Sequence, residues 1–195
     1  MRVRLFTGLA CAALACCAAV PQPRVTLLLA VVMIEGSGWT REGADAALRQ
    51  AGAVLAQCGV VLERADPLVV TVSPNLMDFS TPAARELARA HPVGRPAVYL
   101  VRGTRSRPAF DAEAIGRGNS RTRPEIADTV WMTAATRDPG IALAHELAHV
   151  LMDSGAHSEE AGNLMRGETS ARNTSLSAAQ CARLRDTGSA NGLLK

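Results

Sequence analysis

Three of the four histidines in this 195-residue chain fall within thirteen residues, in the segment IALAHELAHVLMDSGAHSEEAGNLM (141–165). His145 and His149 are four residues apart, and in a helix this spacing places both side chains on one face. Two neutral imidazoles on one face can bind a single metal ion, and zinc is a common partner for such ligands. Glu146 directly follows His145 and can take a proton from a water that the metal activates. The pattern predicts a zinc-dependent hydrolytic site.

The surroundings of these residues favour metal binding over a chance match. A bare His-Glu-x-x-His pattern arises often by accident, so its context decides. The neighbours on the expected helix are apolar: Ile141, Leu143, Leu147, Val150 and Leu151. Imidazoles and a carboxylate buried among them would be costly without partners, and a metal supplies one. The fourth histidine, His91, stands beside Pro92 at the expected end of another helix, and we expect it at the surface.

A catalytic zinc needs a third protein ligand and one position that stays open for water. Gly155 can end the helix and turn the chain back, which would let His157 approach the metal. The carboxylates of Asp153, Glu159 and Glu160 are alternatives. We favour His157 because histidine matches this type of site better. The expected cofactor is one Zn²⁺ ion held by His145, His149 and His157.

These residues resemble the metzincin clan of zinc metallopeptidases, whose signature is His-Glu-x-x-His-x-x-Gly-x-x-His followed by a methionine turn beneath the metal. The first half of the signature matches at His145, Glu146 and His149, and Gly162-Asn163-Leu164-Met165 is similar to the methionine turn. The clan's spacing would place the glycine at 152 and the third histidine at 155, whereas this sequence has Met152 and Gly155 there. The resemblance covers about residues 128–185.

The resemblance implies an endopeptidase in which Glu146 is the general base and Met165 supports the metal-binding histidines by packing. It also implies a peptide or protein substrate that lies across a cleft and pairs with an edge strand. Residues 112–119 and the segment after Met165 would border that cleft. The alternative is an inactive zinc-binding extracytoplasmic module or lipoprotein. Glu146 argues against it, because a structural zinc site does not require this carboxylate. We expect a monomer.

Hydrophobic patterns and turn residues predict the elements that position these side chains. Strands are expected at 24–34, 60–63, 68–72, 96–102 and 128–133, and helices at 40–57, 81–90, 138–151 and 176–188. Residues 103–126 read as a long polar loop with a short extended piece near 112–115. This order predicts an α+β (α/β-like) domain, with a mixed twisted sheet, a backing helix and an active-site helix. The resemblance adds a small C-terminal subdomain that contains the methionine turn and a final helix.

The N-terminus has the pattern of a secretory signal peptide over residues 1–19, which leaves a single domain at 20–195. Positive residues at 1–4 precede the apolar run LFTGLACAALACCAA (5–19). This run is too short for a comfortable membrane span, and no span is expected in the mature chain. Residues 13–16 (ALAC) loosely resemble a lipoprotein cleavage box, so a lipid anchor at Cys16 is the alternative to simple export. Both predict a periplasmic, secreted or membrane-anchored protein.

Export also changes how the remaining cysteines are interpreted. Removal of the signal leaves Cys58 and Cys181, which can form a disulfide in an oxidising compartment or stay as two buried thiols.

The charge of the chain argues against a nucleic-acid partner. The net charge of +3 includes two arginines at the extreme N-terminus, so the chain without that end is close to neutral. A nucleic-acid-binding protein would need a concentrated basic face. Six arginines between residues 102 and 123 stand among Gly, Ser, Thr and Pro, a composition typical of a solvated loop.

Overall fold

The computed structural model describes residues 23–104, 114–117 and 124–195. The predicted signal peptide, with Cys16, lies outside the described residues, as does most of the arginine-rich stretch. The strands are β1 (Val25–Ile34), β2 (Val60–Arg64), β3 (Leu68–Val70), β4 (Asp78–Phe79), β5 (Ala97–Val101), β6 (Gly103–Thr104), β7 (Ala114–Arg117) and β8 (Thr129–Thr133). The α-helices are α1 (Arg41–Leu55), α2 (Thr81–Ala90), α3 (Pro139–Met152) and α4 (Ala178–Ala190). Short 3₁₀ turns lie at Ala56–Cys58, Pro74–Leu76 and Pro124–Ile126.

Within the described residues, six strands form the main sheet, in the order β2-β1-β5-β8-β7, with β3 continuing the β2 edge along β1. All pairings in this sheet are parallel except β7 with β8, which is antiparallel. Every residue of β5 and β8 is buried, as expected for central strands covered on both faces. The predicted α+β fold with a mixed sheet is confirmed.

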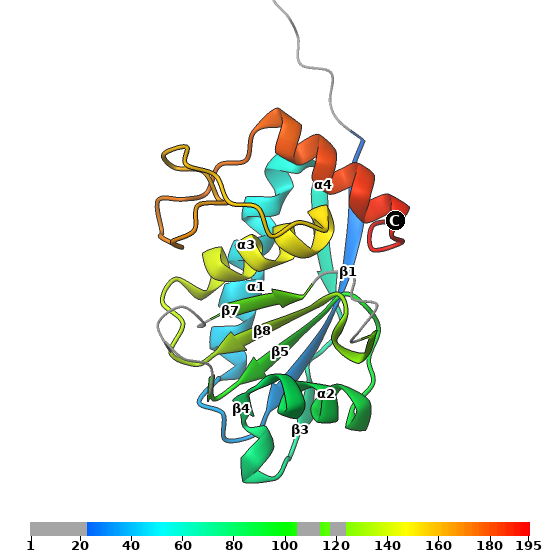
Figure 1. Ribbon diagram of the computed structural model, residues 1–195, viewed down its shortest axis with the longest axis vertical. Helices are drawn as coiled ribbons and strands as arrows, with labels where there is room; N and C mark the ends of the chain where they lie inside the picture. Colours follow the sequence, from blue (N-terminus) through cyan, green and yellow to red (C-terminus); the bar gives the residue numbers. More distant parts are fainter. Residues whose placement is uncertain (1–22, 105–113, 118–123) are drawn as a thin grey trace, which may run out of the picture.

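Alternation along β1 divides the protein into two cores. Leu27, Leu29, Val31 and Met33 face the helices α1, α3 and α4, whereas Val32 and Ile34 face α2. Figure 1 shows α1, α3 and α4 on one side of the sheet and α2 on the other. Helix α3 packs against the sheet and against both α1 and α4, which explains why it is apolar on nearly all sides.

The residues that end α3 and α4 differ from the sequence prediction. Helix α3 ends at Met152, and Asp153, with φ 44° and ψ 53°, turns the chain in the left-handed region, so the prediction of Gly155 as the breaking residue is wrong. Aspartate tolerates this conformation better than most residues with a side chain. Helix α4 continues past Gly188 to Ala190. Gly188 is needed for close packing, because a Cβ there would lie 2.8 Å from Leu194 Cδ1.

The polar stretch at 103–126 contains more structure than its composition suggests. The extended piece expected near 112–115 is β7, whose strand begins at Ala114 and runs to Arg117. Residues 105–113 and 118–123 lie outside the described part, so the predicted cleft border at 112–119 is described only over β7. The two-residue strands β4 and β6 form a separate parallel pair that the sequence did not indicate.

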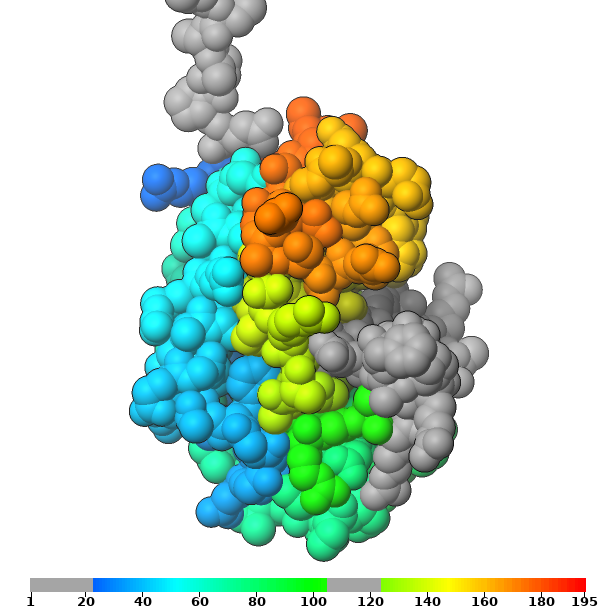
Figure 2. Space-filling view, turned by 90° about the vertical axis from the view of Figure 1, so that its left-hand side faces the viewer, coloured from blue at the N-terminus to red at the C-terminus, as the bar shows by residue number. Residues whose placement is uncertain are grey.

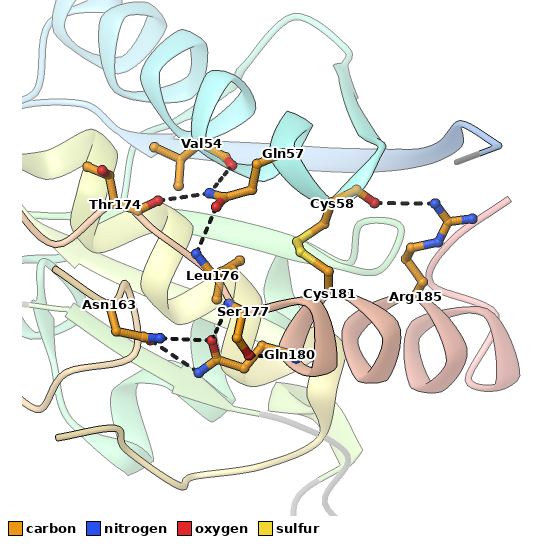
Figure 3. The surroundings of a disulfide bond; sticks show 10 residues. All are labelled: Val54, Gln57, Cys58, Asn163, Thr174, Leu176, Ser177, Gln180, Cys181 and Arg185. Atoms are coloured by element: carbon orange, nitrogen blue, oxygen red, sulfur yellow. Dashed lines mark hydrogen bonds between the residues drawn. A yellow bond between two sulfur atoms is a disulfide. The ribbon is translucent and has the colours of Figure 1, made fainter. Parts of the chain in front are cut away.

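A disulfide between Cys58 and Cys181 joins the turn after α1 to α4, with Cα atoms 4.9 Å apart and a sequence separation of 123 (Figure 3). The Arg185 guanidinium, one turn further along α4, donates to the Cys58 carbonyl at 3.4 Å.

None of the helices in the described ranges combines the length and apolar composition that a membrane crossing requires.

Because the disulfide closes so long a loop, we expect the Cys58→Ala/Cys181→Ala variant to lose about 5 kcal/mol of unfolding free energy through the larger entropy of its unfolded chain. Denaturant unfolding followed by circular dichroism measures this loss. The control is the parent protein under strong reductant, which should match the variant. Equal stability of the variant and the oxidised parent would contradict the prediction.

Candidate metal centre

Helix α3 presents His145 and His149 side by side, one turn apart. Their Nε2 atoms are 2.9 Å from each other, and the two rings are nearly perpendicular, at 83°. His157 lies in the segment that follows the helix, and its Nε2 is 3.3 Å from that of His149. One nitrogen from each ring lies within 4.8 Å of the other two. The structure thus brings together the three histidines that the sequence singled out.

The rival carboxylates do not join this group. Among the described residues, the cluster contains the three histidines and neither Asp153, Glu159 nor Glu160. The Glu160 carboxylate instead accepts a hydrogen bond from the Asn163 side chain at 3.3 Å. The described part of the chain therefore offers three convergent nitrogen donors.

Backbone carbonyls orient two of the imidazoles. The Leu164 carbonyl is 2.7 Å from His145 Nδ1, and the Ser154 carbonyl is 2.6 Å from His149 Nδ1. A carbonyl oxygen can only accept, so Nδ1 carries the proton in both rings and Nε2 of each neutral ring has a free lone pair. Two unprotonated Nε2 atoms 2.9 Å apart cannot hydrogen-bond to each other. A cation shared between them removes this conflict.

Burial keeps these rings neutral. It lowers the pKa of His145 to about 4, opposed by the hydrogen bond to the Leu164 carbonyl and aided by the neighbouring His149 and His157. Burial likewise lowers the pKa of His149, again against a backbone hydrogen bond, here to Ser154. Both imidazoles are therefore unprotonated at neutral pH, which is the state that binds a metal.

The geometry and chemistry of the donors fit zinc. Two nitrogens bound to one tetrahedral zinc at about 2.0–2.1 Å lie roughly 3.3 Å apart, from the geometry of a tetrahedron. In this protein, His149 Nε2 lies 2.9 Å from His145 Nε2 and 3.3 Å from His157 Nε2. Exposure rises across the cluster, from His145 at 3%, through the half-buried His149, to the exposed His157. One side of the cluster therefore faces solvent.

The turn at Asn163–Arg166 contacts both segments that carry the histidines. It is closed by a hydrogen bond from the Arg166 amide to the Asn163 carbonyl, at 3.3 Å, and the side chain of Met165 within it is fully buried. The Leu164 carbonyl orients His145, and the Met165 carbonyl accepts from the amide of Ser158, the residue after His157, at 2.7 Å. Sequence reasoning missed these roles because a backbone carbonyl carries no side-chain signal.

Two further features belong to α3, which carries His145 and His149, or to a strand that packs against it. Glu146 is partly exposed, while Leu147 beside it on α3 is buried. Strand β7 packs near α3 at the edge of the sheet and runs antiparallel to β8, with Ala114 opposite Met132. The helix of the two histidines thus carries a partly exposed carboxylate and packs near an edge strand.

No protein-family model and no curated protein sequence matches this sequence. Among solved structures, the fold is similar to that of metalloproteinase-II from Bacteroides fragilis, with a TM-score of 0.58 and 16% sequence identity. The similarity covers 86% of this chain and 55% of that chain, so this chain spans little more than half of that protein's length. At this identity the likeness demonstrates a shared fold, on which three histidines are grouped as a potential metal site.

Proposed function

We propose that this chain is an exported zinc-dependent endopeptidase, in which His145, His149 and His157 hold one zinc ion. The observation that carries the proposal is the convergence of three Nε2 atoms, two of them on rings whose Nδ1 atoms are occupied by backbone carbonyls. The fold shared with a metalloproteinase supports a peptide substrate, and the signal-like segment at 1–19 supports export. The methionine turn and metzincin character are part of the same proposal.

In the proposed hydrolysis of a peptide bond, the residues of this chain have separate roles. When bound, zinc would acidify a water molecule and polarise the carbonyl of the scissile bond. Glu146 would accept a proton as the water attacks and return it to the leaving amine. A substrate in extended conformation would add to the outer edge of β7 through backbone hydrogen bonds. Met165 would support the histidines from within the core as packing.

The solvent-facing side of the cluster favours a catalytic over a purely structural zinc site. Structural sites are closed by four protein ligands, whereas catalytic sites keep one position for water. In the described residues, His157 is exposed and the group contains three protein donors. An inactive zinc-binding module is the alternative, and the Glu146 experiment below distinguishes the two.

The first prediction concerns the metal. The chain comprising residues 20–195 should retain one zinc ion after dialysis, and His149→Ala or His157→Ala should weaken zinc binding by more than about a hundredfold, since removing a ligand costs more than disturbing its supporting shell. Elemental mass spectrometry and competition with a chelating dye measure both quantities. His91→Ala is the matched control and should bind zinc normally. Unchanged affinity in His157→Ala, with a loss in Asp153→Ala or Glu159→Ala, would reassign the third ligand.

The second prediction concerns the base. Glu146→Ala and Glu146→Gln should lower the turnover of quenched fluorescent peptides by roughly 10²–10⁴-fold, the usual contribution of a general base, while zinc stays bound. The control is Glu86→Gln, which changes an exposed glutamate on α2 in the same way and should be fully active. Retained hydrolysis in the Glu146 variants would contradict the assignment of Glu146 as the general base. A zinc-loaded parent protein that cleaves no peptide library would favour the inactive module.

The third prediction follows from the lowered pKa of His145. Its folded-state value, about 4, lies below its ordinary value of 6.5, so the unfolded chain binds more protons between these two pH values. The metal-free protein should therefore lose stability as the pH falls from 6.5 to 4, by about 3 kcal/mol from this residue. Denaturant unfolding of the parent and of His145→Gln across this range isolates the effect. Parallel stability profiles for the two proteins would count against a buried, neutral His145.

A further inference from the structure

The side chain of Asn163 is almost fully buried, at 2% exposure, and all of its hydrogen-bonding capacity is used. Its Oδ1 accepts from the Met165 amide at 2.9 Å and from Gln180 Nε2 at 3.1 Å. Its Nδ2 donates to Gln180 Oε1 at 2.9 Å and to Glu160 Oε2 at 3.3 Å. Figure 3 shows Asn163 and Gln180 facing each other as a reciprocal amide pair between the turn and α4.

A backbone group determines which way this pair faces. The Ser177 amide, at the start of α4, donates to Gln180 Oε1 at 2.8 Å as part of a capping box. Gln180 must therefore present its NH₂ group to Asn163 Oδ1, which in turn leaves Oδ1 directed at the Met165 amide. The Ser177 amide thus fixes the orientation of the Gln180 amide, which fixes that of the Asn163 amide, and Asn163 Oδ1 in turn accepts from the backbone of the turn.

The turn, held in this way by Asn163, is hydrogen-bonded to both segments that carry the histidines. Its Leu164 carbonyl, which precedes the Met165 amide, accepts from His145 Nδ1, and its Met165 carbonyl accepts from the Ser158 amide next to His157. We propose that the Asn163–Gln180 pair is a positioning element of the metal centre, which sets the tautomer of His145 and the place of His157. The zinc-binding part rests on the proposed function; the tautomer part does not.

The turn has other attachments, so loss of the pair should not unfold the segment. The Leu164 amide donates to the Ser175 carbonyl at 2.7 Å, and the Thr174 and Ser175 amides donate to the Gly162 carbonyl at 3.0 Å each. A second amide, Gln57, also clamps this region, with Nε2 donating to the Val54 and Thr174 carbonyls and Oε1 accepting from the Leu176 amide. Figure 3 shows Gln57 on the α1 side, away from Asn163.

These two clamps allow a matched comparison. In Gln180→Glu, the carboxylate still accepts from the Ser177 amide and from Asn163 Nδ2, but it cannot donate to Asn163 Oδ1. The Asn163 side-chain amide can then turn over, so that its NH₂ group replaces Oδ1 opposite residue 180. The Met165 amide would lose its hydrogen bond to Asn163 Oδ1. Gln57→Glu makes the same chemical change at a clamp that does not touch the turn, and it serves as the control.

Three measurements test the proposal. In metal-free protein, nitrogen–proton correlation spectra of the imidazoles should show His145 protonated at Nδ1 in the parent and in Gln57→Glu, and a mixture of tautomers in Gln180→Glu. Zinc affinity should fall roughly 10–100-fold in Gln180→Glu, the usual cost of disturbing the groups that orient a ligand. The visible absorption of the cobalt-substituted protein should weaken in that variant, because the geometry of the site is less well defined.

Each outcome is decisive. An unchanged His145 tautomer in Gln180→Glu overturns the proposal, and so does an equal effect in Gln57→Glu, which would indicate general loosening of the C-terminal segment. A shifted tautomer with unchanged zinc affinity overturns the zinc-binding part. If the parent itself binds no zinc, the proposed function fails, and a shifted tautomer in Gln180→Glu would still establish that the pair sets the tautomer of His145.

Discussion

The hydrogen bond from His145 Nδ1 to the Leu164 carbonyl is the interaction on which the centre depends. It spans 19 residues and connects the buried helix α3 to the turn at Asn163–Arg166. A ring exposed by only 3% needs a partner for each of its nitrogens, because an unpaired polar group in the core is costly. This carbonyl occupies Nδ1 and leaves the lone pair of Nε2 pointing towards His149. The chemistry of the site follows from that choice of tautomer.

The segment between α3 and α4 has little regular structure, so its position depends on attachments to the helices around it. Figure 2 shows residues 154–176, coloured yellow-orange to orange, at one end of the molecule beside the surface of α1. The Asn163–Gln180 pair holds the middle of this region. The Gln57 clamp holds its C-terminal end, and the Cys58–Cys181 disulfide anchors α4, which follows it. Such a segment can carry an exposed ligand like His157 because a rigid scaffold supports it on one side.

The core provides the rigidity that a metal centre requires. Strands β5 and β8 are buried on both faces, and α3 packs against this sheet and against the helices α1 and α4. A helix held on nearly all sides keeps His145 and His149 at a fixed separation, while the partly exposed Glu146 remains accessible from solvent. Burial also keeps both imidazoles neutral, so the fold prepares the ligands before any ion arrives.

Features that depend on near neighbours along the chain could be predicted from the residues alone. Hydrophobic periodicity predicted the main strands and helices and the α+β class, the four-residue spacing of His145 and His149 predicted a shared face, and two cysteines outside the signal-like segment left one candidate pair. Features that depend on contacts between distant segments emerged only in the folded chain, because tertiary packing fixes them. It selected Asp153 over Gly155 as the turning residue, used Gly188 for packing against Leu194, and brought His157 to the helix. The orientation of the Asn163 amide and the acceptor for His145 could not be predicted, because backbone carbonyls are identical in every residue and only the folded chain determines which of them a side chain meets.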